Sequence, residues 1–389
     1  MPASPFSLFP NYGYPDHPAF PFAVSHAEGS WLYSENGDKY LDLFAGIAVN
    51  NLGHRHPAVQ AAVADQLQKV WHTSNYFLSP TVIQLAQTLT KASGHCTRAF
   101  LCNSGVEANE AAFKLARKFT GKKKILAFHN SFHGRSHTTL SATGQPRIRQ
   151  GFFPLGEEYY IHGHINDNSA LELIDESLAA IVIEPIQGDG GLYPAEPDFL
   201  RALALMCRES GVLLIVDEIQ TGMGRTGQLF AYQNFGVEPD IISLAKGLGN
   251  GLPIGAILAR EELAETFNYG SHGTTFGGNL LAVRAAAAVL EVIQQPGFLA
   301  EVQEKGLWLL NELKTKLAGN PKVKELRGLG LMQGVALHEP VAPYLERLCR
   351  EHNVACIGAG PDVLRLVPAL TISRAELEMA VQAIVAVLS

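Results

Sequence analysis

The sequence predicts an α/β protein built around a largely parallel β-sheet and followed by a second, smaller α+β domain. From about Arg98, short apolar runs alternate with helical stretches, a rhythm typical of parallel sheets that helices cover on both faces. The predicted strands are residues 99–102, 124–128, 179–184, 212–217, 241–245 and 254–259. Near Gly277 this rhythm stops, and a long helical run over 278–294 leads into a region with helices and strands of its own.

The chain before the sheet is expected to pack elsewhere on the fold. Residues 1–30 are rich in Pro and aromatic residues, and residues 31–44 alternate sufficiently for a hairpin with a turn at Asn36-Gly37. We therefore predict three parts: an N-terminal segment (1–45) that packs with the small domain, a large ligand-binding domain (46–285) and the small domain (286–389).

The bulk composition argues against several classes of protein. Acidic residues outnumber basic ones by 37 to 30, and the densest basic run is only Lys122-Lys123-Lys124, so a nucleic-acid surface is not expected. No apolar run approaches the roughly 20 residues of a membrane span, and the N-terminus lacks the basic start of a secretory signal. The five cysteines are scattered and odd in number, so we expect reduced thiols in a cytoplasmic protein.

Two side chains at predicted strand ends suggest the chemistry. The strand over 212–217 ends in Asp217, and the strand over 241–245 is followed directly by Lys246. Because parallel α/β sheets place ligands outside the carboxyl ends of their strands, we expect both side chains in one site. The pair suits pyridoxal phosphate: the lysine would hold the aldehyde, and the aspartate would keep the ring nitrogen protonated.

A candidate phosphate site follows the first predicted strand. Ser104 and Glu107 have the spacing of a helix-capping box, and Gly105 would let the backbone approach a ligand closely. Free N–H groups at the start of a helix attract phosphate. Taken alone, the pattern is more typical of a capped helix with nothing bound, so it gains meaning only beside Asp217 and Lys246.

Three histidines, His129, His133 and His137, recur every four residues and could bind a metal ion if they shared a helix face. Gly134 and the polar surroundings favour a loop instead, so we predict no metal site.

Two further stretches could contact a cofactor or substrate. Phe132 is a flat ring that could stack on a cofactor, and Arg135 carries a fork that suits a carboxylate. Residues 274–279 form a hydroxyl-rich turn that could reach phosphate oxygens or merely cap the following helix. A core aromatic and a surface salt bridge are the ordinary alternatives for Phe132 and Arg135.

The run from Gly222 to Gly227 matches the dinucleotide fingerprint Gly-x-Gly-x-x-Gly and makes a nicotinamide-dependent oxidoreductase the alternative. Its context disagrees with that function. Four residues (218–221) separate the strand end from the first glycine, and the next strand leads to Lys246, where that fold needs an acid for the ribose. We interpret the run as a glycine-rich loop.

With these residues in place, the chain resembles the class III, fold-type I aminotransferases over nearly its whole length, and within them it is most similar to those that act on acetylornithine. The motifs that carry the resemblance are Phe44 to Val49, Gly53 to Pro57, Trp71 to Asn75, Asn103 to Glu110, Phe132 to Arg135, Glu184 to Gly188, Asp217 to Gly227, Lys246, His272 to Asn279, Arg327 to Met332 and Leu364-Arg365. The resemblance implies a mainly parallel seven-stranded sheet between helices, pyridoxal 5'-phosphate as cofactor, and a homodimer with active sites at the subunit interface.

The resemblance also implies which residues hold the cofactor ring. Lys246 would bind the aldehyde, Asp217 would pair with the ring nitrogen, and Gln220 would bond the ring hydroxyl. Glu218 and Ile219 lie between these positions and are assigned to the same pocket.

The phosphate and the ring face involve a second group of residues. Gly105 and Val106 would hold the phosphate through backbone N–H groups, with Ser104 nearby. Phe132 would stack on the ring, and Thr275 would reach the phosphate from the other subunit. Val106 departs from the family, in which Thr is usual, but a backbone contact tolerates the change.

The substrate residues implied by the resemblance are four. Arg135 would bind the α-carboxylate of acetylornithine, and Thr274 would lie beside the substrate. Arg365 would bind a carboxylate of glutamate in the second half-reaction. Asp189 stands where the family usually has the Glu that pairs with this arginine, and its shorter side chain would reach Arg365 less easily.

Two other departures concern aromatic positions. Phe276 stands at a position where the family commonly has Tyr. The N-terminal tyrosine that contacts substrate in the family could correspond to Tyr12 or Tyr14, with His17 as a third alternative.

The expected reaction is a ping-pong transfer of the terminal amine of N2-acetyl-L-ornithine to 2-oxoglutarate, giving N-acetyl-glutamate 5-semialdehyde and glutamate, as in arginine biosynthesis. Ornithine, succinylornithine, succinyldiaminopimelate and 4-aminobutyrate are the alternative donors. A protein that keeps the fold without catalysis is disfavoured by the intact Asp217, Lys246, Arg135 and Thr275. Because a free lysine with a pKa of ~10.4 is almost wholly charged at pH 7, the site must favour the neutral amine through desolvation and nearby positive charge.

Overall fold

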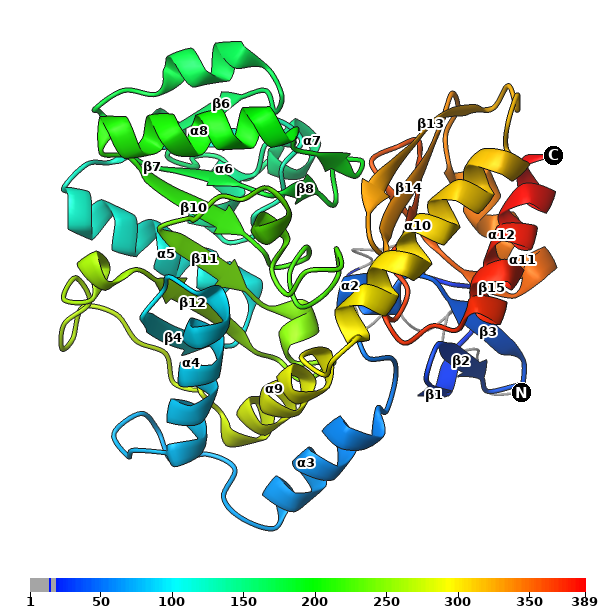
Figure 1. Cartoon of the computed structure of the whole chain (residues 1–389), viewed down its shortest axis with the longest axis horizontal. Coiled ribbons are helices and arrows are strands. Elements are labelled where there is room, and N and C mark those ends of the chain that lie inside the picture. Colours follow the sequence, from blue (N-terminus) through cyan, green and yellow to red (C-terminus); the bar gives the residue numbers. More distant parts are fainter. Residues whose placement is uncertain (1–13, 15–18) are drawn as a thin grey trace.

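A seven-stranded sheet forms the centre of the larger lobe in the computed structural model, which describes residue 14 and residues 19–389 (Figure 1). The strands in spatial order are β4 (Arg98–Cys102), β12 (Gly255–Ala259), β11 (Ile241–Leu244), β10 (Leu213–Asp217), β7 (Leu178–Ile183), β5 (Lys124–Phe128) and β6 (Tyr160–Gly163). Only β12 is antiparallel to its neighbours, so the predicted mainly parallel sheet is confirmed. Strand β6 was not predicted; it is a four-residue edge strand with two half-buried positions.

Helices cover both faces of this sheet because neighbouring strand residues point to opposite faces. In β7, Val182 packs beneath α5 (Gly105–Thr120), whereas Ile183 belongs to the core on the other side. The helices that contribute to that second core are α3 (Pro57–Leu67), α4 (Pro80–Ser93), α8 (Pro197–Ser210) and α9 (Leu280–Ile293).

Short elements connect these layers. They are α6 (His137–Ala142), α7 (Pro146–Arg149), the 3-10 turns η1 (Glu157–Tyr159), η2 (Asn168–Leu173), η3 (Ala231–Asn234), η4 (Lys246–Leu248) and η5 (Glu261–Leu263), and the strand pair β8 (Ile186–Gln187) and β9 (Tyr193–Pro194). The turn η4 begins at Lys246, and only Ala245 separates it from β11.

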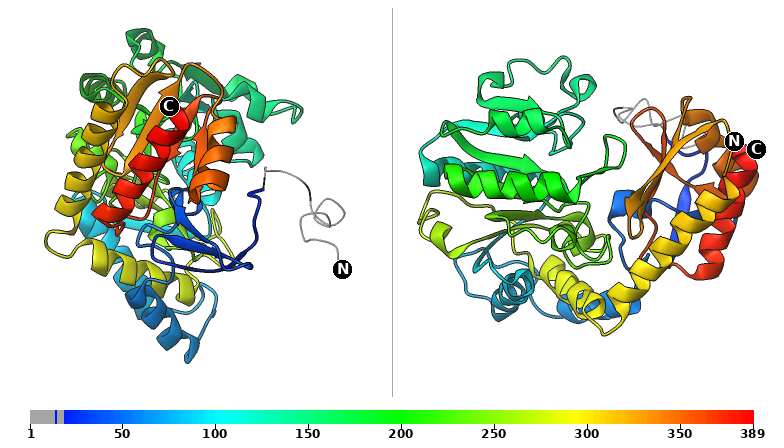
Figure 2. Two further views of the ribbon diagram at one scale, coloured as in Figure 1. Left: turned by 90° about the vertical axis from the view of Figure 1, so that its right-hand side faces the viewer. Right: turned by 45° about the horizontal axis from the view of Figure 1, so that its top comes forward.

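The smaller lobe follows α9 along the chain. Helix α10 (Phe298–Lys316) leads from the large lobe along the small one, as Figure 2 shows in its right-hand view. The remaining elements are β13 (Val323–Leu329), β14 (Met332–Leu337), α11 (Ala342–His352), β15 (Val354–Ala355), β16 (Ile357–Ala359), β17 (Val363–Leu366) and α12 (Arg374–Leu388). The sheet β13-β14-β17-β16 and these helices share a separate apolar core.

The N-terminal segment joins the small lobe through a second sheet. Strands β1 (Val24–Glu28), β2 (Trp31–Ser34) and β3 (Lys39–Asp42) are antiparallel, and β3 pairs in parallel with β15. The hairpin predicted over 31–44 is thus confirmed. Of the three N-terminal candidates for substrate contact, Tyr12 and His17 lie outside the described residues, and Tyr14 is exposed. The domain limits at 45 and 285 stay predictions.

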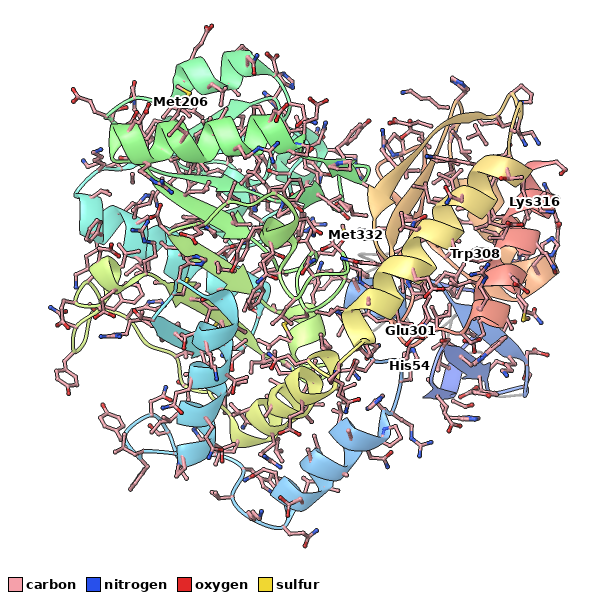
Figure 3. The ribbon with its side chains drawn as sticks, in the orientation of Figure 1. His54, Met206, Glu301, Trp308, Lys316 and Met332 are labelled. Carbon is pink, nitrogen blue, oxygen red and sulfur yellow. The ribbon has the colours of Figure 1, made fainter. Side chains whose placement is uncertain are left out.

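Arg225 links the two lobes behind the site. Its buried guanidinium donates to the carbonyl of Leu331 at 3.0 Å and to Oδ1 of Asn51 at 2.6 Å. Figure 3 labels Met332, the next residue of this contact region, at the side of the small lobe that faces the large lobe. The run 222–227 is therefore a structural turn that contacts the small lobe, and no α-helix begins in it as a dinucleotide site requires.

Among the described residues, no helix combines the length and the apolar character that crossing a bilayer would demand.

Candidate active site

A cavity opens at the carboxyl ends of the central strands, beside the small lobe. Residues from several separate segments line it: Gly46, Ile47, Val49, Asn103 to Val106, Phe132 to Arg135, Glu184, Asp189, Asp217, Ile219, Gln220, Ala245, Lys246 and Gly251 to Ile254. Both Asp217 and Lys246 are in this set, so the two side chains share one cavity, as their positions at strand ends predict.

Lys246 leaves the sheet in an unusual backbone conformation. Its φ of 43° lies in the left-handed region, two positions after the last residue of β11. Burial and, after it, the positive charge of Arg365 together lower the pKa of the Lys246 amine to about 8, against the opposing effect of nearby acids. These are the two causes that the sequence analysis required for a neutral amine.

Asp217 is held by a network that the sequence analysis did not predict. Its Oδ2 accepts hydrogen bonds from Asn109 Nδ2 at 2.8 Å and from His133 Nδ1 at 2.7 Å, and its Oδ1 accepts from the Ile219 amide at 3.1 Å. Asp217 and His133 are both buried. Hydrogen bonding to Asp217 and the charges of Asp217 and Glu184 raise the pKa of His133 against the effect of burial. Positive character on His133 stabilises the carboxylate that faces the cavity.

Glu184 is a second missed acid. It follows β7 directly, lines the cavity, and accepts from the amides of Phe132 at 2.9 Å and Gly188 at 3.3 Å. Burial raises the pKa of this carboxyl to about 7. Its position after a buried strand was the available signal, the same one that identified Asp217, whereas Asn109 and His133 carry no comparable signal.

The candidate phosphate site lies at the start of α5. Ser104 is the N-cap, and its Oγ accepts from the Glu107 amide at 3.2 Å, as predicted. The Glu107 carboxylate accepts from the Asn103 amide at 2.6 Å, whereas a capping box would have it accept from the Ser104 amide. The reciprocal bond is therefore displaced by one residue. A Cβ on Gly105 would come within 2.8 Å of the Ile219 side chain, which explains why glycine is needed where this helix meets the cavity.

The donor set of the cavity fits pyridoxal phosphate. Lys246 supplies an amine for the aldehyde, Asp217 an anion for the ring nitrogen, and the start of α5 N–H groups for the phosphate. The buried Oε1 of Gln220 has no hydrogen-bond partner among the described residues, so it can accept from the ring hydroxyl. Val106, Phe132 and Ile219 add apolar surface to the same cavity.

The substrate residues lie at different depths. Arg135 is exposed and lines the cavity beside Phe132, with 5.6 Å between its guanidinium carbon and the ring centre. Arg365 is buried behind Asp189: the closest Nη1–Oδ1 distance is 3.5 Å, and Nη1 also donates to the Gly188 carbonyl at 3.2 Å. The shorter Asp189 therefore still reaches the arginine, but at a long distance.

Four assigned residues do not line the cavity of this chain: Arg365, described above, and Thr274, Thr275 and Glu218. Thr274 contacts a residue that does line the cavity: its Oγ1 accepts from Asn103 Nδ2 at 3.0 Å. Thr275 is exposed on the same turn. Glu218 is buried, and its carboxylate accepts from Thr221 Oγ1 at 2.9 Å and the Tyr232 amide at 2.8 Å, a contact set that supports a structural role instead of a cofactor contact.

His129, His133 and His137 do not lie on one face of a helix. His133 bonds to Asp217, whereas His129 stacks on His164 with ring centres 4.3 Å apart. Within the described part of the chain, no group of three or more His, Cys, Asp or Glu residues is placed to hold a metal ion.

Comparisons with known proteins agree with this geometry. The model of the family "Aminotransferase class-III" matches residues 12–388. The chain is 48% identical over 378 residues to acetylornithine aminotransferase of Bacillus subtilis (strain 168), covering 96% of each chain. The structure of ornithine aminotransferase from Toxoplasma gondii ME49 superposes with a TM-score of 0.94 at 31% identity, covering 98% of this chain and 94% of that one. That of N-acetylornithine aminotransferase from Stenotrophomonas maltophilia K279a has a TM-score of 0.84 at 35% identity, with 98% of both chains covered. These matches agree with the shared cavity of Lys246 and Asp217. They show that the chain belongs to the class III aminotransferases, which are enzymes that depend on pyridoxal phosphate.

Proposed function

We propose that this enzyme transfers the terminal amine of N2-acetyl-L-ornithine to 2-oxoglutarate, yielding N-acetyl-glutamate 5-semialdehyde and glutamate. The single observation that carries the proposal is the shared cavity of Lys246 and Asp217, with Arg135 at its exposed edge. The relative from Bacillus subtilis supports acetylornithine as the donor.

The cofactor and the protein divide the chemistry. Pyridoxal phosphate, when bound, supplies an electron sink for negative charge that develops at the substrate carbon. Lys246 would hold the cofactor at rest, and its lowered pKa suits it to accept a proton at that carbon and return it. Asp217 would keep the ring nitrogen protonated, and the bonds from His133 and Asn109 fix its direction.

Arg135 and Arg365 would bind the carboxylates of the two substrates. Arg135 is exposed and can meet the α-carboxylate of an incoming donor as a bidentate partner. Arg365 is buried and loosely paired with Asp189, so it would serve the second carboxylate of the dicarboxylic acceptor. Thr274, held by Asn103, would lie beside the bound substrate.

We further propose a homodimer, with Thr275 reaching the partner's phosphate site. The segment from Trp71 to Leu78 leaves large apolar side chains uncovered: Tyr76 is 96% exposed and Leu78 is 91% exposed. Phe276, next to Thr275, is also exposed. An apolar surface of this kind beside a site is typical of a subunit interface.

A cytoplasmic location completes the proposal. All five cysteines, which lie within the described residues, are buried and free. Free thiols are typical of reducing compartments.

The test is a coupled assay with 2-oxoglutarate as acceptor and three donors: acetylornithine, ornithine and 4-aminobutyrate. The proposal expects the highest kcat/KM for acetylornithine. A preference for either of the other donors would replace the substrate assignment and leave the reaction class intact.

A further inference from the structure

Ser136 stands at the start of a helix but does not cap it. It is the N-cap residue of α6 and directly follows Arg135. A serine at this position usually accepts a hydrogen bond from an amide of the first turn and so stabilises the helix. In the part of the chain that the structure describes, no amide of α6 donates to this hydroxyl; it donates instead to Oε1 of Glu110 at 2.6 Å. The local cap is thus replaced by a bond to a different helix, α5.

Two consecutive residues of α5 hold the loop that carries Arg135. Asn109 Nδ2 donates to the His133 carbonyl at 2.8 Å, and the Glu110 carboxylate accepts from Ser136. The first anchor lies two residues before Arg135, and the second lies directly after it. The backbone on both sides of the arginine is therefore fixed to one helix.

The same loop is packed closely between α5 and α6. A Cβ on Gly134 would clash with Thr139 Oγ1 of α6 and would lie 2.8 Å from Val106 Cγ2 of α5. Thr139 Oγ1 also lies 3.0 Å from Ser136 Oγ, so the hydroxyl that bonds Glu110 has a second polar contact. Because Gly134 and Ser136 flank Arg135, a shift of either would move the arginine backbone.

Arg135 depends on such support because its side chain is long and exposed. An exposed arginine keeps most of its rotamer freedom, so only its backbone is fixed before a substrate binds. Bidentate binding of a carboxylate requires one direction of the guanidinium plane. A displacement of the supporting backbone would therefore weaken the contact even though the arginine itself is intact.

Helix α5 also serves the cofactor side of the site. Its start offers N–H groups at the candidate phosphate site, and Asn109 donates to Asp217 Oδ2 at 2.8 Å. Because Glu110 ties the arginine loop to this helix, the cofactor residues and the carboxylate-binding residue share one rigid reference. The helix, more than the loop, then sets how far the arginine lies from the reacting groups.

We propose that Glu110 is a positioning residue: through Ser136 it holds Arg135 in the direction in which the guanidinium meets the α-carboxylate of the amino donor. The inference rests on the proposed function, which assigns Arg135 to that carboxylate. Glu110 is half-buried and does not line the cavity. Its effect must therefore appear in donor binding, and only while Arg135 is present.

The bond is tested with Glu110→Ala and with Glu110→Gln, which keeps an oxygen for the Ser136 hydroxyl. In Glu110→Ala, KM for acetylornithine should rise about fivefold to tenfold, within the range for one hydrogen bond. The kcat should change less than about twofold, and the visible absorbance of the bound cofactor should stay the same. Glu110→Gln should keep KM within about twofold of the wild-type value. A KM as high in Glu110→Gln as in Glu110→Ala would overturn the proposal.

Two further variants complete this set. Ser136→Ala removes the donor of the same bond and should match Glu110→Ala, so the bond can be assessed even if one of the two variants fails to fold. Glu209→Ala, which truncates an exposed glutamate on α8, is the control and should leave KM unchanged. A wild-type KM in either Glu110→Ala or Ser136→Ala would contradict the positioning role.

A double-mutant cycle separates positioning from a merely structural role. KM for acetylornithine is measured in the wild type, Glu110→Ala, Arg135→Ala and the double variant. If Glu110 acts through Arg135, its removal should change KM less than about twofold once the arginine is absent. An equal rise of KM in both backgrounds would overturn the proposal, and so would a loss of thermal stability in Glu110→Ala with an unchanged KM.

The same measurements distinguish this inference from the proposed function. If the wild-type protein does not turn over acetylornithine, or if Arg135→Ala leaves KM unchanged, the assignment of Arg135 to the donor carboxylate fails, and this inference fails with it. If Arg135→Ala raises KM and Glu110→Ala does not, only this inference fails.

Discussion

Replacing Asp217 by Asn tests the electrostatic centre of the site. The side chain keeps its size, but one of its two carboxylate oxygens is replaced by an NH2 group. Oδ2 accepts two donors, Asn109 and His133, so the amide oxygen belongs there and the new NH2 faces the Ile219 amide. The Ile219 N–H then faces the new NH2 group, and neither donor has an acceptor there.

The magnitude follows from two effects. A buried polar group left without a partner costs about 1–3 kcal/mol. Loss of the anion opposite a protonated ring nitrogen removes one member of a buried charge pair, which costs about 3–5 kcal/mol. If the second cost is expressed in the barrier, kcat falls by about 10²–10⁴.

The assay measures kcat by coupled turnover and cofactor content by visible absorbance on the same preparation. Asp240→Asn is the matched control: Asp240 precedes β11 at the opposite end of the sheet and accepts from the Leu214 amide at 2.7 Å. This control should lose stability and keep kcat. The reasoning is refuted if Asp217→Asn with full cofactor content retains more than about a tenth of the wild-type kcat.

Three further outcomes follow from the same geometry. Lys246→Ala should abolish turnover and the visible absorbance band at roughly 410–430 nm that the lysine-linked cofactor produces; a mutant that keeps both would remove the lysine from its assigned role. Arg135→Ala should raise KM for acetylornithine far more than it lowers cofactor content, since Arg135 is proposed to bind substrate, and equal losses of both would count against this. In cofactor-free protein, uptake of pyridoxal phosphate should accelerate about tenfold per pH unit below pH 8 and level off above it, because only the neutral amine reacts and the Lys246 pKa is lowered to about 8. A rate that still climbs through pH 10 would indicate an unshifted lysine.

The sequence predicted those parts of the fold and site that depend on local order along the chain. Asp217 and Lys246 could be assigned because Asp217 ends one buried strand and Lys246 lies two positions beyond another, and strand ends in a parallel sheet converge on one edge. Ser104 could be assigned as a helix cap because its partner lies three residues away. The six predicted strands of the large sheet were mainly apolar runs, whereas β6, with His162 and two half-buried positions, gave a weaker signal.

The network around Asp217 could not be predicted in this way. Asn109 and His133 are 108 and 84 residues from Asp217 along the chain, and their bonds to it depend on how α5 and the loop after β5 pack on the sheet. The left-handed turn α2 (Ala45–Ala48), whose four residues all have positive φ values, was equally hidden, because Ala and Ile are poor signals for positive φ. Glu218 adjoins Asp217 in sequence, but it does not line the cavity, and its hydrogen bonds are with Thr221 and Tyr232.

The pairing of Asp189 with Arg365 shows why a shortened side chain can still suit the reaction. Arg365 is buried, and burial lowers its pKa, so the guanidinium needs an anion nearby to remain charged at low cost. Asp189 supplies one at 3.5 Å, longer than a charge-assisted hydrogen bond of about 2.7–2.9 Å. The pair is therefore held by charge attraction more than by directed bonding, and the Nη1 bond to Gly188 fixes the guanidinium independently of Asp189. If Arg365 binds the dicarboxylic acceptor as proposed, a substrate carboxylate that makes two short bonds to it would bind it more strongly than Asp189 does, and an aspartate at this position would favour release of the arginine.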